Sequence, residues 1–192
     1  MKRRYSILLA SLALSGSAAL AQEGAIEFDL GGNFFSGSVV TDLGEGTAGA
    51  ANAGADILAI EWSGLSLITF NNIGIPNYGS EAMIGITAVN SQGDAETYFV
   101  FPFPNANYQG TPSAPITQAG PERLDISSLG LTLDVNGSID ALLRSAFDDQ
   151  SGSPAGEWQA GTVRVIYEAI PAPGALALIG LAGLLTRGRR RR

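Results

Sequence analysis

The stretch LGLTLDVNGSI, residues 129–139, carries the clearest fold signal in the chain. Its apolar residues alternate with small or polar ones: Leu129, Leu131, Leu133 and Val135. A period of two is typical of a strand with one buried face. The Asn-Gly pair that follows supplies the two positive-φ positions of a type I′ turn. The stretch therefore predicts a β-hairpin, and the turn explains Asn-Gly-Ser at 136–138 better than a glycosylation sequon does.

The segment after this turn, residues 138–147, fits two structures. Its apolar residues have the spacing of one helical face: Ile139, Leu142, Leu143, Ala146 and Phe147. A strand would instead turn a different set inward: Ile139, Ala141, Leu143 and Phe147. Because a hairpin turn precedes the segment, we favour the strand.

Other segments have the length and composition of strands, rich in β-branched or aromatic residues and bounded by Gly, Ser or Asn. They are residues 25–30, 35–41, 56–62, 65–70, 82–89, 96–101 and 158–168. Helical signal is nearly absent between them, and no repeat of fixed period occurs. We predict an all-β fold, a single antiparallel sandwich or jelly-roll-like domain, flanked by an N-terminal signal helix and a C-terminal hydrophobic sorting helix.

The N-terminal segment has the three parts of a signal peptide. Lys2, Arg3 and Arg4 form a positive region, and residues 7–14 form a short apolar run. The small residues Ala19 and Ala21 follow, as a signal peptidase requires before its cleavage site, and Gln22 comes directly after that site. We predict that residues 1–21 are removed and that Gln22 begins the mature chain.

The C-terminal segment, IPAPGALALIGLAGLLTRGRRRR at 170–192, joins a proline-containing turn to an apolar run and an arginine cluster. The uncharged residues 175–185 cover roughly 16 Å as a helix, about half of a ~30 Å hydrocarbon core. Arginines hold such an end on the cytoplasmic side of a membrane. A span this short suits transient insertion during processing, with an ordinary single-span anchor as the alternative.

This tail resembles the PEP-CTERM sorting tail of Gram-negative bacteria, with Pro-Ala-Pro where Pro-Glu-Pro is usual. The matching residues are Pro171, Ala172, Pro173, Gly174, Arg189, Arg190, Arg191 and Arg192. The resemblance covers only residues 170–192, and implies cleavage by an exosortase-like enzyme at the inner membrane, then a place at the cell surface or in the extracellular matrix. Similar tails also occur on some ice-binding proteins, but this chain contains no Thr-x-Thr ladder.

Charge and composition exclude several function classes for the exported β domain, residues 22–169. Residues 22–170 carry three arginines against 18 acidic residues, a net charge of −15, which repels nucleic acid. The chain has no His or Cys and no Lys after Lys2, so His-based triads, thiol nucleophiles and Schiff bases are absent. Only paired carboxylates remain, without a clear motif. We predict that the protein is not an enzyme.

Two loops are predicted from small residues and prolines. Residues 44–54, GEGTAGAANAG, have the composition of a loop tip. Residues 102–121 hold five of the nine prolines, which excludes a central strand. Long ordered loops are often functional.

Two ligand classes remain open. Four aromatic side chains could stack on sugar rings of an exopolysaccharide, or could equally belong to the core: Trp62, Trp158, Tyr78 and Tyr108. The acidic run DDQSGS at 148–153 could bind calcium if Asp148 met a distant partner such as Asp42 or Glu45. No cofactor is otherwise predicted. The preferred interpretation is an exported surface or matrix protein, and the alternative is a non-catalytic carbohydrate-binding module.

Overall fold

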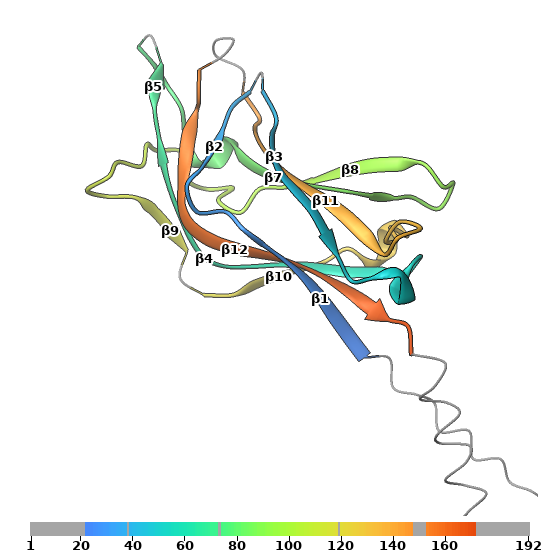
Figure 1. The fold of residues 1–192 in the computed structure, drawn as a ribbon. Helices are drawn as coiled ribbons and strands as arrows, with labels where there is room; N and C mark the ends of the chain where they lie inside the picture. Colours follow the sequence, from blue (N-terminus) through green and yellow to red (C-terminus); the bar gives the residue numbers. More distant parts are fainter. Residues whose placement is uncertain (1–21, 38, 73, 119, 148–152, 172–192) are drawn as a thin grey trace, which may run out of the picture.

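Two antiparallel sheets form the part of the chain that the computed structural model describes, residues 22–37, 39–72, 74–118, 120–147 and 153–171 (Figure 1). The larger sheet contains β1 (Gln22–Asp29), β2 (Asn33–Phe35), β4 (Ile57–Thr69), β9 (Ile116–Gln118), β10 (Glu122–Asp125) and β12 (Gly156–Ala169). The smaller contains β3 (Thr41–Thr47), β7 (Ala82–Val89), β8 (Ala95–Val100) and β11 (Ser138–Ser145). A short ribbon pairs β5 (Asn71–Asn72) with β6 (Ile75–Pro76).

Three 3₁₀ turns complete the described elements: η1 (Ala50–Asn52), η2 (Gly79–Glu81) and η3 (Ser127–Leu129). None of the described helices is long and apolar enough to cross a membrane. The predicted signal helix and sorting helix lie outside the described residues.

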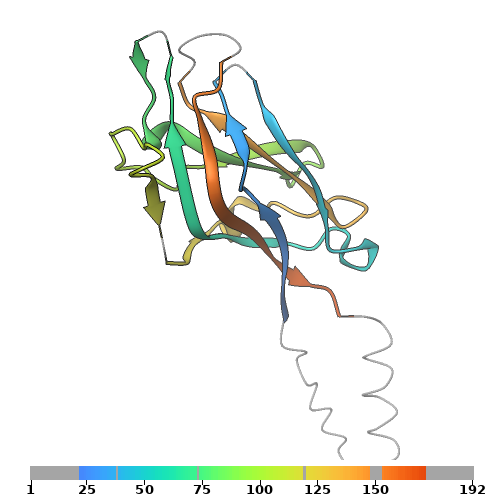
Figure 2. The same ribbon diagram turned by 60° about the vertical axis from the view of Figure 1, so that its left-hand side comes forward.

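The strand order is that of a jelly roll. The main strands run β1-β12-β4-β10 in one sheet and β3-β11-β7-β8 in the other. Every step between successive main strands crosses from one sheet to the other, except the hairpin from β7 to β8 (Figure 2). Such a double Greek key closes a sandwich of two four-stranded layers. The all-β antiparallel prediction is confirmed.

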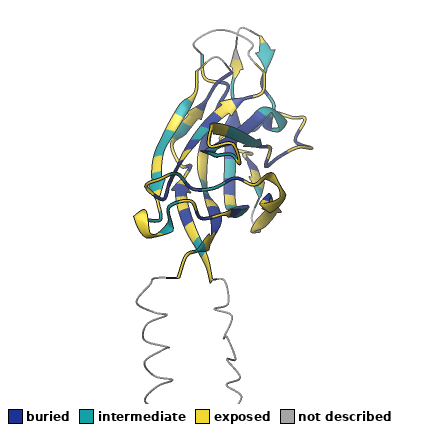
Figure 3. Ribbon diagram, turned by 90° about the vertical axis from the view of Figure 1, so that its right-hand side faces the viewer, coloured by how far each residue is buried: buried dark blue, intermediate teal, exposed yellow. Residues whose placement is uncertain are grey.

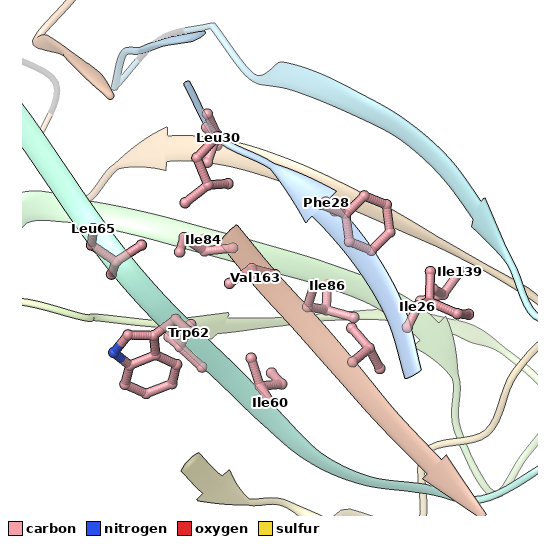
Figure 4. Close-up of a cluster of buried hydrophobic side chains, with 14 of the residues drawn as sticks. Ile26, Phe28, Leu30, Ile60, Trp62, Leu65, Ile84, Ile86, Ile139 and Val163 are labelled. Carbon is pink, nitrogen blue, oxygen red and sulfur yellow. The ribbon is translucent and has the colours of Figure 1, made fainter. Parts of the chain in front are cut away.

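The core lies between the two sheets and is filled by alternate residues of their strands. Side chains from both layers point toward one another in Figure 4: Ile26 and Phe28 from β1, Ile60, Trp62 and Leu65 from β4, Val163 from β12, Ile84 and Ile86 from β7, and Ile139 from β11. Figure 3 shows buried and exposed residues alternating along the strands. Burial of each large apolar side chain contributes about 1.5–3 kcal/mol.

Four predicted strands and the favoured reading of residues 138–147 are confirmed. Residues 25–30, 82–89, 96–101 and 158–168 fall in or overlap β1, β7, β8 and β12. Residues 138–145 form β11, with Ile139, Ala141 and Leu143 buried. Phe147 was expected inward but lies beyond the strand and is exposed.

The prediction of separate strands at 56–62 and 65–70 is wrong, because β4 runs unbroken through Gly64. Gly64 has φ 61°, and the pairing with β12 shifts register nearby. A glycine inside a strand can hold such an irregularity without ending the ladder. Gly64, which predicts a break between two strands, is therefore the site of a bulge within one strand.

The predictions for residues 35–41 and 44–54 are also wrong in part. β2 ends at Phe35 and β3 begins at Thr41, so Val39 and Val40 belong to an exposed connection. The predicted loop tip begins inside β3, where a Cβ on Gly46 would collide with Ile26 and Phe28. Glycine here permits close packing of an edge strand on the opposite sheet rather than loop freedom.

The hairpin predicted at 129–139 is present only around its turn. Leu131 and Leu133 are buried, but Leu129 and Val135 are exposed, and Thr132 makes only isolated bridges to Asp56 and Val89. The Gly137 amide donates to the Asp134 carbonyl at 3.0 Å, so residues 135–136 occupy the centre of the turn. Gly137 follows with φ 74°, as in a three-residue hairpin loop rather than type I′.

Candidate functional site

The first and last strands of the domain bring its two ends together. Gln22 opens β1 and pairs with Ala169, the last residue of β12. Pro171 is exposed just beyond this pair. The other residues predicted for processing lie outside the described residues: Ala19, Ala21, Ala172, Pro173, Gly174, Arg189, Arg190, Arg191 and Arg192.

A side-chain amide holds the point where the chain leaves the domain. The Ile170 amide donates to Asn52 Oδ1 at 3.0 Å, and Asn52 Nδ2 donates to the Ala48 carbonyl at 2.9 Å. A hollow of about 230 Å³ lies beside this contact, between residues 54–56 and 168–171. Sequence patterns did not reveal Asn52, because the contact joins residues far apart in the chain.

Of the two interpretations left open for the tryptophans, sugar stacking and the core, the core holds for both. Trp158 is fully buried, between Phe35 and Phe103 at centroid distances of 6.1 and 6.0 Å. Trp62 is 7% exposed and donates from Nε1 to Gln118 Oε1 at 3.0 Å.

The other two aromatic candidates differ in exposure. Tyr78 is half-buried, whereas Tyr108 is 56% exposed. Of the four candidates, Tyr108 alone has the exposure that stacking on a ligand requires.

An acidic hollow of about 280 Å³ lies beside β3, β7 and β11. Asp140 of β11 stands directly opposite Glu45 of β3, and Asp134 lines the same hollow. Burial and the charges of Glu45, Asp42 and Asp134 raise the pKa of Asp140. Like charges placed directly opposite are unfavourable in a sheet, so this hollow favours cations.

The acidic hollow does not form a metal centre within the described chain. Asp42 and Glu45, the proposed distant partners for calcium, lie on β3. Asp148 and Asp149 lie outside the described residues. Among the described residues, no group of three or more metal-ligating side chains is arranged to hold an ion.

The three arginines of the domain all have oxygen partners. Arg123 contacts Glu23 at 2.8 Å and Glu61 at 3.1 Å, and Arg164 contacts Glu61 at 3.0 Å. Arg144 donates from Nε to the Gly37 carbonyl at 3.2 Å. The arginine cations are therefore engaged away from the acidic hollow.

Comparisons with known proteins give a fold likeness only. No family model matches the chain, and no curated protein matches it. The VP2 subviral particle of infectious bursal disease virus is similar at 18% identity, over 81% of this chain and 34% of that chain, with a TM-score of 0.41. The Gx strain of the virus gives 17% identity, 80% and 35% coverage and a TM-score of 0.32.

The T13 viral particle gives 16% identity, 78% and 36% coverage and a TM-score of 0.33. This chain spans about a third of the length of these viral chains. The fold class rests on the sheet topology instead.

Proposed function

We propose that the chain is an exported, non-catalytic protein of the cell surface or extracellular matrix of a Gram-negative-type bacterium. In this proposal a signal peptidase cuts between Ala21 and Gln22. An exosortase-like enzyme then recognises Pro171-Ala172-Pro173-Gly174 while the tail is transiently inserted in the inner membrane, with residues 189–192 on the cytoplasmic side.

The pairing of Gln22 with Ala169 is the observation that carries the proposal. Gln22, the proposed first mature residue, is the first described residue of β1, and β12 ends two residues before Pro171. Gln22 and Ala169 thus bring the two described ends of the domain together at one end of the sandwich (Figure 1). Cuts just before Gln22 and beyond Pro171 leave every described strand intact.

Composition supports a non-catalytic role. Residues 22–170 contain no His, Cys or Lys, which removes most nucleophile and base pairs. The alternative function, a carbohydrate-binding module, is weakened because Trp62 and Trp158 are buried in the core and cannot stack on a sugar. Acidic surface charge suits a soluble domain that does not bind nucleic acid.

The test is processing in a host with and without an exosortase-like enzyme. We expect intact mass and terminal sequencing of surface material to show a chain that begins at Gln22 and lacks Arg189 to Arg192. Pro171→Ala with Pro173→Ala should leave the unprocessed tail in the inner membrane, while Pro112→Ala in the β8–β9 loop should process normally. Recovery of wild-type chain ending at Arg192 in the inner membrane would show an ordinary anchored protein.

A further inference from the structure

The proline-rich connection from β8 to β9 forms one wall of an open groove of about 440 Å³. Residues 102–106 and Tyr108 line it from the loop, and Glu122, the first residue of β10, lines it from the sheet. The volume falls in the range of small-molecule sites. All the lining residues belong to the described chain.

The loop is fixed by backbone hydrogen bonds to two neighbouring elements. The amides of Gly79 and Ser80 in η2 donate to the carbonyls of Tyr108 and Ala106 at 3.3 and 3.0 Å. The Thr69 amide at the end of β4 donates to the Gly110 carbonyl at 3.0 Å. In return, the Gly110 amide donates to Thr69 Oγ1 at 3.1 Å.

Packing fixes the loop a second time. Phe103 is 8% exposed and stacks on Trp158 in the core. A Cβ on Gly110 would lie 2.7 Å from the Leu67 carbonyl oxygen, so the loop backbone lies directly on β4. A wall held in this way loses little conformational entropy when a ligand binds.

The exposed groups in the groove combine one aromatic face with neutral and anionic hydrogen-bonding groups. Tyr108 is 56% exposed, and the Asn105 amide and Glu122 carboxylate are exposed beside the apolar surface of Pro104. No cationic side chain lines the groove. An anionic ligand would therefore meet the Glu122 carboxylate and no cation, and a quaternary ammonium would lack the several aromatic faces that form a cage.

We propose that this groove binds a neutral sugar ring of a polysaccharide, stacked by its CH face on Tyr108. Asn105 offers both a donor and an acceptor to neighbouring hydroxyls, and Glu122 accepts from a hydroxyl. The inference is independent of export and processing, because it depends only on the folded domain.

The experiment measures binding of three neutral probes, maltohexaose, cellohexaose and laminarihexaose, to the purified full chain by calorimetry. We expect at least one to bind, and Tyr108→Ala to weaken it about tenfold, the loss expected for one stacking contact. Glu122→Gln should weaken it less, because the amide still accepts a hydrogen bond. Phe147→Ala, which removes an aromatic ring of similar exposure outside the groove, should leave affinity unchanged.

Thermal unfolding of each variant checks that the fold is retained. A polyuronate and a proline-rich peptide serve as competing ligands. No binding of any neutral hexaose at millimolar concentration would overturn the proposal. Equal loss in Tyr108→Ala and Phe147→Ala, or preference for the polyuronate or peptide, would also overturn it.

Discussion

The outer faces of the two sheets differ in how their charged residues are arranged. Across the larger sheet, one row of directly paired residues runs Glu27, Arg164, Glu61 and Arg123, on β1, β12, β4 and β10. Its charges alternate in sign, and Glu61 contacts both arginines. Across the smaller sheet, the corresponding row runs Glu45, Asp140, Thr87 and Thr97, on β3, β11, β7 and β8. Its two carboxylates face each other.

The pKa shifts follow this difference. A hydrogen bond from Arg123 lowers the pKa of Glu23, at the edge of the paired face. Burial and three neighbouring carboxylates raise the pKa of Asp140. With three arginines for 18 acidic residues, strand register decides which face is neutralised. The same composition therefore yields one face whose carboxylates pair with arginines and one whose opposed carboxylates favour an external cation.

Removing the centre of the paired row should have the largest effect. Glu61→Ala leaves Arg123 and Arg164 without their shared partner, and we expect the free energy of unfolding to fall by about 1 kcal/mol, the upper end for exposed ion pairs. Urea unfolding measures it. Glu157→Ala on β12, for which the described residues show no ion pair, is the control. Equal losses in both variants would mean that the row contributes no specific stability.

The two threonine hydroxyls in the row of the smaller sheet should contribute less to the free energy of unfolding. Thr87 Oγ1 and Thr97 Oγ1 are 2.8 Å apart across β7 and β8. Thr87→Val keeps the shape and removes this hydrogen bond, so we expect a loss of about 0.5 kcal/mol in urea unfolding. The double variant with Thr97→Val measures the coupling. Simple additivity of the two single changes would show that the contact is energetically neutral.

Neutralising Asp140 should act in the opposite direction. Asp140→Asn relieves repulsion from Glu45, and we expect a gain of a few tenths of a kcal/mol at neutral pH, since water screens this exposed group. Because the folded-state pKa is raised, protonation stabilises the native chain. The benefit of acid is complete below the unfolded pKa of about 4 and is lost as pH rises through the folded pKa.

Thermal melts of wild type and Asp140→Asn between pH 3 and 7 test this sign. The two curves should converge in acid and separate near neutrality, and added salt should narrow the gap. A stability difference that is the same at every pH would show that Asp140 does not feel its acidic neighbours.

The end of the paired row should have the smallest effect. Glu27 lies 3.7 Å from Arg164 Nε, with both side chains largely in water. Glu27→Gln should leave the urea midpoint unchanged within error, because such a contact contributes almost nothing after screening. A loss as large as that of Glu61→Ala would mean that the row acts as a cooperative network.

Local sequence patterns predicted the strands in which buried and exposed residues alternate. They missed features that depend on contacts with other strands. Ile26 and Phe28 mark β1 because the pleat alone decides which residues face the core. The turn at Gly137 correctly favoured a strand for β11 over the helical pattern. Gly64 and Gly46 misled the prediction, because a bulge and a close sheet-to-sheet contact use the same residue as a loop does.

The candidate sites depended more heavily on three-dimensional contacts. A tryptophan beside a strand end has the same local sequence whether it is buried, as Trp158 is, or exposed. The acidic hollow needs the register that places Asp140 opposite Glu45, which no local pattern encodes. The proposed processing residues differ in kind, because they rest on short terminal motifs that involve no tertiary contact, and they stay a prediction.

The neighbouring positions of β1 and β12 also govern when the domain can fold. Among the described strands, β1 pairs along its whole length with β12, from the other end of the domain. β4 likewise depends on β12 for its most extensive pairing. Bringing β1 to β12 costs the entropy of closing a loop almost as long as the domain, and no contact between the two strands offsets that cost until they meet. Pairing is therefore slow, and β1 stays without its sheet partner until β12 has been made. Under the proposed export, such a delay keeps the polypeptide unfolded enough to pass a translocation pore, and completion of β12 is the step that closes the larger sheet.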